Sequence, residues 1–306
     1  MTKQFGVMVG LDKQAAFEGW FSKIDDRENG FMLSIIWGYS THQNTKHAFL
    51  QFQDSFHHNT AYIQYPLDEL KWEKDPFVLQ IGNNELSKKG IHLDFVMNGV
   101  PVQGEFRFGT FSPIKQSILK PNIMGWLTFF PNECNHSIIS MYHNVDGNIK
   151  IGNQAWKVQE ADGYIEKDWG TGFPKEYVWA QANDWKKSSV VFSYATVPML
   201  GKYAKGFFLV LQHDEKEYRF SSIEGSKLTD FHVSQDAFQA IIKKKGCCIT
   251  LKAKQFNPVA LAAPKHGEMQ SYIKESLDGT MELTLEMKNQ MPITLSSQRA
   301  SIDVHY

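Results

Sequence analysis

Residues 164–174 read Tyr-Ile-Glu-Lys-Asp-Trp-Gly-Thr-Gly-Phe-Pro, so two carboxylates stand among three aromatic rings near the middle of the chain. A carboxyl group that aromatic rings shield from water has a raised pKa and can act as a general acid. In an extended segment, side-chain alternation puts Glu166 and Asp168 on one face, and Lys167 with Trp169 on the other. Two carboxylates so close cannot both ionise cheaply in a dry site, so one would hold a proton. These residues predict proton-donor chemistry at Glu166 or Asp168.

A joint between domains is the structural alternative for the same stretch. Gly170, Gly172 and Pro174 suit a sharp bend, because glycine reaches backbone conformations closed to other residues and proline fixes φ. In a joint, Lys167 would simply neutralise its acidic neighbours. Composition alone favours the joint over the catalytic site, and both interpretations predict a sharply bent segment.

Further candidates lie on either side of this stretch. Glu18 stands beside Trp20 near the start of the chain. Read as a strand, residues 179–183 put Trp179, Gln181 and Asn183 on one face, which would give an aromatic wall and two neutral hydrogen-bonding groups. For the tryptophans alone, plain core packing is the favoured interpretation.

The sequence lacks the motifs of several common kinds of binding and catalytic site. Gly170-Thr171-Gly172 is too short for a phosphate-binding loop, and the chain has no dinucleotide fingerprint. His57-His58, His136 and His143 lack the helical spacing of a zinc motif, and there is no CxxC. A GxSxG elbow is also missing. We therefore expect neither a cofactor nor a metal.

Charge and cysteine usage restrict the partners and the compartment. The 306 residues carry 32 basic and 33 acidic side chains, a net charge of −1, which gives no reason to expect nucleic acid or anionic lipid. Three cysteines, two of them adjacent, are a poor disulfide framework and favour a reducing compartment. The longest uncharged run, Ser188–Gly201, is too short to span a bilayer. We expect a soluble, cytoplasmic protein with no integral membrane segment and no signal peptide, and leave peripheral membrane contact open.

Short apolar or alternating runs, separated by turn signals such as Asn29-Gly30 and Asn98-Gly99, predict an antiparallel all-β fold. A short helix is expected near 12–17, and residues 66–75, which could form a helical turn, are left open. The expected strands are 31–37, 47–53, 61–65, 77–81, 91–97, 105–108, 124–130, 137–143, 148–151, 154–159, 177–183, 189–197, 205–212, 217–222, 247–254, 281–287 and 293–304. Asp146-Gly147 would be the hairpin turn between two of them.

An internal repeat emerges when the chain is shifted by 159 positions. The shift aligns Trp20 with Trp179, Leu33 with Phe192, Ser34 with Ser193, and Phe49-Leu50 with Phe208-Leu209. Matches at one offset over three consecutive strands predict an internal duplication into two β-domains of ordinary size. The expected domains are residues 1–174 and 175–306.

Residues 164–174, followed by Trp179, Gln181 and Asn183, resemble the central motif of plant and cyanobacterial tocopherol cyclases. The resemblance spans most of the chain, and the matching segments are Phe17-Glu18-Gly19-Trp20, Gly125-Trp126, Phe130-Pro131, His136, Met141, Leu261-Ala262-Ala263-Pro264 and the run to Ala300. Two positions depart from the plant motif, since Asp168 replaces its asparagine and Phe21 its tyrosine. The asparagine makes Glu166 the stronger candidate acid. Carotenoid 1,2-hydratases share part of the motif.

The resemblance implies two lipocalin-like antiparallel β-barrel or sandwich domains with an apolar cavity near their junction. It also implies cofactor-independent cyclisation of a prenylated quinol or similar isoprenoid, in which Glu166 or Asp168 protonates an alkene and a phenol oxygen closes the ring. Indole faces would stabilise the cation. The expected substrate-binding residues are Glu18, Trp20, Lys167, Trp169, Trp179, Gln181 and Asn183.

Three alternatives to cyclisation stay open at this point. Capture of the cation by water would make the protein a hydratase. A non-catalytic binder or transporter of an apolar ligand would use the same kind of cavity. A protein–protein interaction module would need an exposed apolar patch, which the sequence does not reveal.

Overall fold

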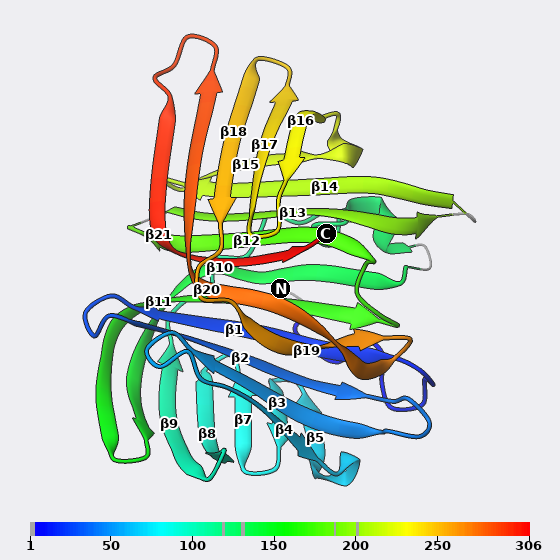
Figure 1. Cartoon of the computed structure of the whole chain (residues 1–306), viewed down its shortest axis with the longest axis vertical. Coiled ribbons are helices and arrows are strands. Elements are labelled where there is room, and N and C mark those ends of the chain that lie inside the picture. Colours follow the sequence, from blue (N-terminus) through cyan, green and yellow to red (C-terminus); the bar gives the residue numbers. More distant parts are fainter. Residues whose placement is uncertain (1–3, 118–119, 130–131, 187, 200–201) are drawn as a thin grey trace. The chain divides into compact units, whose positions relative to one another are not determined.

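A computed structural model describes residues 4–117, 120–129, 132–186, 188–199 and 202–306. It contains twenty-one β-strands and three short 3-10 helices, η1 (Leu67–Glu69), η2 (Gly125–Phe129) and η3 (Ser222–Glu224) (Figure 1). All strand pairs are antiparallel where their register is given, which confirms the predicted all-β class. No helix in the described part of the chain has the length and apolar character needed to cross a membrane.

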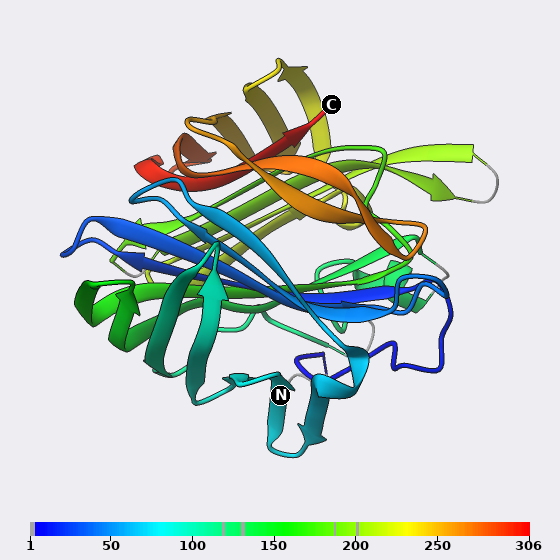
Figure 2. The same ribbon diagram turned by 60° about the horizontal axis from the view of Figure 1, so that its bottom comes forward.

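The first compact unit comprises residues Met1–Gln116, Cys134–Phe173 and Leu261–Ser271. Its 11-stranded sheet has the order β4-β3-β2-β1-β11-β10-β9-β8-β7-β6-β5. These strands are β1 (Phe17–Asp26), β2 (Phe31–Ser40), β3 (His47–Asp54), β4 (Thr60–Tyr65), β5 (Leu70–Lys74), β6 (Phe77–Ile81), β7 (Asn84–Ser87), β8 (Gly90–Met97), β9 (Val100–Phe108), β10 (Cys134–Ile151) and β11 (Gln154–Gly170). The cyan strands run across the direction of the blue ones in both views, so the sheet curls over on itself (Figure 1, Figure 2).

The curled sheet encloses the core of this unit. Side chains of one alternating set, among them Trp20, Ile35, Trp37 and Phe52, are fully buried in it. Each such side chain contributes roughly 1.5–3 kcal/mol of burial free energy. Because strand side chains alternate, the residues between them face away from this core.

Residues 261–271 belong to the first unit although they come late in the chain. The side chain of Gln51 exchanges hydrogen bonds with the backbone of Ala262, at 2.7 and 3.2 Å. Ser40 Oγ donates to the carbonyl of Gly267 at 2.6 Å, and Phe173 N donates to the carbonyl of Pro264 at 3.1 Å. Gly267 also lies so close to the Ala15 backbone that a Cβ there would come within 2.1 Å of it.

The second compact unit comprises residues Ser117–Glu133, Pro174–Ala260 and Tyr272–Tyr306. Its 10-stranded sheet has the order β15-β14-β13-β12-β21-β20-β18-β17-β16, with β19 paired to β20. These strands are β12 (Glu176–Trp185), β13 (Ser188–Met199), β14 (Lys202–His213), β15 (Lys216–Ser221), β16 (Lys227–Val233), β17 (Ala237–Lys244), β18 (Cys247–Lys254), β19 (Val259–Lys265), β20 (Glu268–Met287) and β21 (Ile293–His305).

The two sheets share one strand order. In each, the first four strands follow one another outward from the first, and the last strand pairs with the first from its other side. This is the order that an internal duplication produces. The offset of 159 fails in the first strand, however. Trp20 faces the core of its unit, whereas Trp179 faces away from its own core, because Val178 and Ala180 on either side of it belong to that core.

Four local predictions are wrong. No helix forms at 12–17, because Ala15 has a φ of 51°, outside the right-handed helical region, and β1 begins at Phe17. Residues 125–129 form η2 in place of the strand expected over 124–130, of which Phe130, like Pro131, lies outside the described residues. Asp146-Gly147 lies inside β10 and is no turn, since Gly147 pairs with Phe106 on β9 and with Val158 on β11.

The fourth correction concerns the sharp bend predicted for residues 164–174. Residues 164–170 are the extended end of β11, held by hydrogen bonding to β1 on one side and β10 on the other. Only residues 171–175 connect β11 to β12. Pairing on both sides fixes the backbone, so the side chains of this stretch keep strict alternation.

Candidate functional site

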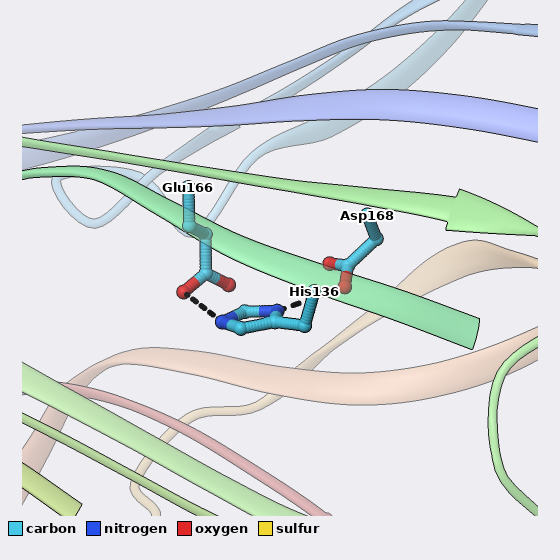
Figure 3. Close-up of side chains that lie close together, drawn as sticks. All are labelled: His136, Glu166 and Asp168. Atoms are coloured by element: carbon cyan, nitrogen blue, oxygen red, sulfur yellow. Dashed lines mark hydrogen bonds and ion pairs between the residues drawn. The ribbon is translucent and has the colours of Figure 1, made fainter. Parts of the chain in front are cut away.

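His136 lies between two carboxylates on neighbouring strands, with His136 on β10 and both acids on β11 (Figure 3). The strand register puts His136 directly opposite Asp168. Its Nδ1 lies 2.8 Å from Asp168 Oδ1, and its Nε2 lies 3.5 Å from Glu166 Oε2. The first contact is a hydrogen bond, whereas the second is an ion pair beyond good hydrogen-bond distance. One imidazole therefore links two carboxylates through its two nitrogens.

Tyr164 completes this group from two residues upstream on β11. Its hydroxyl donates to Glu166 Oε2 at 2.5 Å, and the ring is fully buried. Burial and the nearby carboxylate of Glu166 raise the pKa of Tyr164 well above its usual value of 10. The tyrosine therefore stays a hydrogen-bond donor at any physiological pH. We call Tyr164, Glu166, Asp168 and His136 the acid cluster.

Opposing influences set the charge of His136. Burial alone would lower the pKa of His136, but the negative charges of Asp168 and Glu166 and the hydrogen bond to Asp168 raise it to about 9. The imidazole is then cationic at neutral pH. Side-chain exposure is 7% for Glu166, 14% for His136 and 22% for Asp168, so Glu166 is the most shielded acid. The cluster can take up and release a proton in a largely dry environment.

The acid cluster faces away from the core of the first unit. Ile165 and Lys167 alternate with its carboxylates along β11, and Ile165 belongs to that core. Lys167 pairs in register with Trp20, another core residue. The structure therefore brings Glu166 and Asp168 together with His136, and places Glu18, Trp20 and Lys167 on the other face of the sheet.

Lys167 and Glu18 form a fully buried ion pair on that other face. The ammonium group of Lys167 also donates to the Gly6 carbonyl and lies 4.5 Å from the Trp20 ring centre and 5.3 Å from that of Trp169. Burial lowers the pKa of Lys167 to about 8, with Glu18 opposing this effect. The contacts around Lys167 are thus an internal carboxylate, a backbone carbonyl and two indole rings.

Glu18 anchors the N-terminal segment to the sheet. Its two carboxylate oxygens accept from Met8 N at 2.6 Å and from Val9 N at 2.9 Å, and the Tyr39 hydroxyl donates to it as well. Trp20 Nε1 adds a hydrogen bond to the Phe5 carbonyl at 2.7 Å. These contacts favour a structural role for the pair, and substrate binding by Glu18, Trp20, Lys167 and Trp169 stays a prediction.

Trp179, Gln181 and Asn183 lie in the second unit, on β12. All three are buried, and they alternate with Val178, Ala180 and Ala182, which belong to the core of that unit. The three side chains therefore share the face of β12 that points away from the core. That they line the same site as Glu166 stays a prediction.

A family model described as tocopherol cyclase-like matches residues 101–305, about two thirds of the chain. The chain belongs to the tocopherol cyclase-like family. This confirms the resemblance found in residues 164–183. Comparison with curated proteins gave no match.

Solved structures with this fold support the lipocalin-like architecture of the tocopherol cyclase-like chain. The crystal structure of CghA with Sch210972 is 8% identical, with a TM-score of 0.60 over 94% of this chain and 88% of the other. An AttH-type protein, NE1406 of Nitrosomonas europaea, is 10% identical, with a TM-score of 0.56 over 99% and 96%. Kievitone hydratase from Nectria haematococca is 8% identical, with a TM-score of 0.52 over 94% and 88%. At such identities the likeness shows the fold.

The acid cluster of this tocopherol cyclase-like protein also offers three metal-ligand side chains. Ligand atoms of His136, Glu166 and Asp168 all lie within 4.8 Å of one another. The two acids, however, contact opposite nitrogens of the ring, and a single ion can bind only one of these nitrogens. One acid would have to move around the ring to share an ion with the other. The arrangement fits proton transfer better than metal binding.

Sequence reasoning assigns no role to two side chains of the acid cluster. His136 matches the family and lacks zinc-motif spacing, but nothing in the sequence places it beside Glu166 and Asp168. Tyr164 enters the sequence analysis only as one of three aromatic rings. The usable signal was the alternation Tyr164, Glu166, Asp168, which places the tyrosine on the face of the two acids.

Proposed function

We propose that the chain is a cyclase- or hydratase-type enzyme in which the acid cluster protonates an alkene of an apolar substrate. Family membership supports the reaction type. The observation that carries the proposal is the double contact of His136, whose imidazole links Glu166 and Asp168 through its two nitrogens. The substrate class that we propose is a prenylated quinol or a similar isoprenoid.

Glu166 is the proposed proton donor. Donation starts from a neutral Glu166 carboxyl group beside the cationic His136. The carboxylate that remains after donation is stabilised by the opposite charge of the imidazole. Asp168 holds the imidazole through Nδ1 and keeps it cationic, and its greater exposure suits it less to donation.

The reaction then proceeds in two balanced steps. The π electrons of the alkene form a C–H bond with the Glu166 proton, which leaves a tertiary carbocation and a Glu166 carboxylate. Tyr164 and His136 stabilise that carboxylate by a hydrogen bond and by charge. A phenol oxygen of the substrate, or a water molecule, next forms the C–O bond. Its proton returns to the Glu166 carboxylate, which restores the cluster. The phenol gives a cyclase and water gives a hydratase.

Deuterium incorporation tests the proposed step. The wild-type protein is incubated in D₂O with a prenylated hydroquinone, and the product is analysed by mass spectrometry. Alkene protonation puts one non-exchangeable deuterium on carbon. Glu166→Gln should lower turnover at least a hundredfold, the usual scale for a general acid, and Glu160→Gln, an exposed position on the same strand, should not.

Two results would count against the assignment. Normal turnover of Glu166→Gln and Asp168→Asn would remove the carboxylates from the mechanism. Binding of the hydroquinone without any product would support the second candidate, a non-catalytic carrier of apolar ligands. Mass spectrometry of apolar molecules that copurify with the protein gives an independent measurement, since a saturated fatty acid would also favour the carrier.

A further inference from the structure

A second buried carboxylate lies on the sheet of the second unit. Asp303 on β21 pairs in register with Trp179 on β12 and with Glu275 on β20. Its neighbours along β21, Ile302 and Val304, pack in the core of that unit, so Asp303 points away from it. Asp303 is 3% exposed and takes no part in the acid cluster of the first unit.

The two Asp303 oxygens differ in their hydrogen bonding. The Tyr177 hydroxyl donates to Oδ2, and Oδ1 has no hydrogen-bond partner among the described residues. Ser301, two residues away on the same face of β21, has a fully buried hydroxyl that likewise lacks a partner in the described part of the chain. A buried polar group without a partner is costly, so two such groups on one face of β21 indicate a place for an exogenous hydrogen-bonding group.

The surroundings restrict the chemistry of that group. A carboxylate oxygen needs a donor, and a serine hydroxyl can serve as either donor or acceptor. Trp179 and Tyr177 place two aromatic rings on the same face of β12. A flat aromatic group with a hydroxyl would satisfy all of these features.

We propose that the face of β12 and β21 formed by Tyr177, Trp179, Ser301 and Asp303 binds a phenolic hydroxyl, with Asp303 Oδ1 as its acceptor and Ser301 Oγ as a second partner. This phenol site goes beyond the proposed proton donor and does not rest on it. Its readout is binding, so the two can fail separately.

The charge of Asp303 gives the site a pH dependence. Burial raises the pKa of Asp303 to about 7, and the hydrogen bond from Tyr177 only partly offsets this. The other titratable groups that neighbouring positions place on this face are Glu275 on β20 and His305, whose ring centre lies 5.5 Å from that of Tyr177. Above pH 7 the ionised carboxylate is the stronger acceptor, so a phenol should bind more tightly there.

The test compares two small probes, 4-methylphenol and 4-methylanisole, in which a methyl group replaces the hydroxyl hydrogen and removes the donor. Their affinities for the full-length protein are measured by calorimetry at pH 5.5 and pH 8.5. We expect a preference of about tenfold for the phenol at pH 8.5, the size of one hydrogen bond to a charged group, and a much smaller preference at pH 5.5. Asp303→Asn should abolish the preference and its pH dependence, and Ser301→Ala should reduce it.

Asp236→Asn is the matched control, because this aspartate of the same unit is 55% exposed. It should keep the wild-type preference. Equal affinities for the two probes at both pH values would overturn the proposal and would leave bound water as the partner of Asp303 and Ser301. Retention of the preference in Asp303→Asn would overturn it as well.

Discussion

Glu166 and Asp303 occupy corresponding places in two sheets of the same strand order. Each lies on the last strand of its sheet, on the face turned away from its core, and each accepts a hydrogen bond from a tyrosine hydroxyl. They differ in their surroundings. Glu166 has a cationic imidazole beside it, whereas burial dominates at Asp303 and raises its pKa. The duplicated fold thus holds one carboxylate paired with a cation and one that takes its proton near neutrality.

The pH dependence of turnover should report His136. The mechanism needs the cationic imidazole, so the rate constant should fall as pH rises through about 9, the pKa of His136. His136→Gln should lower turnover at least a hundredfold and remove that decline. His232→Gln, at an exposed position, should leave the profile unchanged. A decline near pH 9 that persists in His136→Gln would belong to another group.

The buried pair of Glu18 and Lys167 should show strong coupling in unfolding experiments. Glu18→Gln or Lys167→Met alone leaves one charge buried without its counterion, which costs about 3–5 kcal/mol. The double variant replaces both charges and should cost much less than the sum of the two single variants. Urea unfolding followed by tryptophan fluorescence gives the coupling energy. Additive losses would show that the two charges are stabilised independently.

Asp303 should make the protein less stable as pH rises from 4 to 7. Its pKa in the folded state, about 7, exceeds the ordinary value of 3.8, so in this window the folded state keeps a proton that the unfolded chain has lost. A difference of this size corresponds to roughly 4 kcal/mol. Asp303→Asn should therefore raise the free energy of unfolding at pH 8 by up to that amount, and change it little at pH 4. An equal effect at both pH values would exclude ionisation as the cause.

Alternation was the property of the site that the sequence could predict. Residues 164–169 lie in a strand paired on both sides, so their side chains alternate as the period of two requires. His136 could not be found in this way. Register shifts interrupt the pairing of β10 with β11 between Ile138 and Gly147, so the spacing along the chain does not give the partner of any one residue.

Strand positions were predicted well where apolar runs are short and bounded by turns. The strands 77–81 and 247–254 agree with the structure at both ends. Predictions failed where polar residues lie buried in the sheet, as in β1, whose ten residues FEGWFSKIDD are all buried. The charged residues of β1 interrupt the apolar pattern that indicates a strand, although Glu18 and Lys23 are buried. Local hydropathy does not indicate such positions, because their partners come from distant strands.

The insertion of residues 261–271 into the first unit has a consequence for folding during synthesis. The backbone of Ala262 and the carbonyl of Gly267 supply partners to Gln51 and Ser40, which leave the ribosome some two hundred residues earlier. The sheet that carries the acid cluster must therefore wait, with these polar groups unmatched, until nearly nine tenths of the chain has been translated. A nascent chain stalled shortly before residue 261 would hold both Glu166 and His136 in an unfinished scaffold.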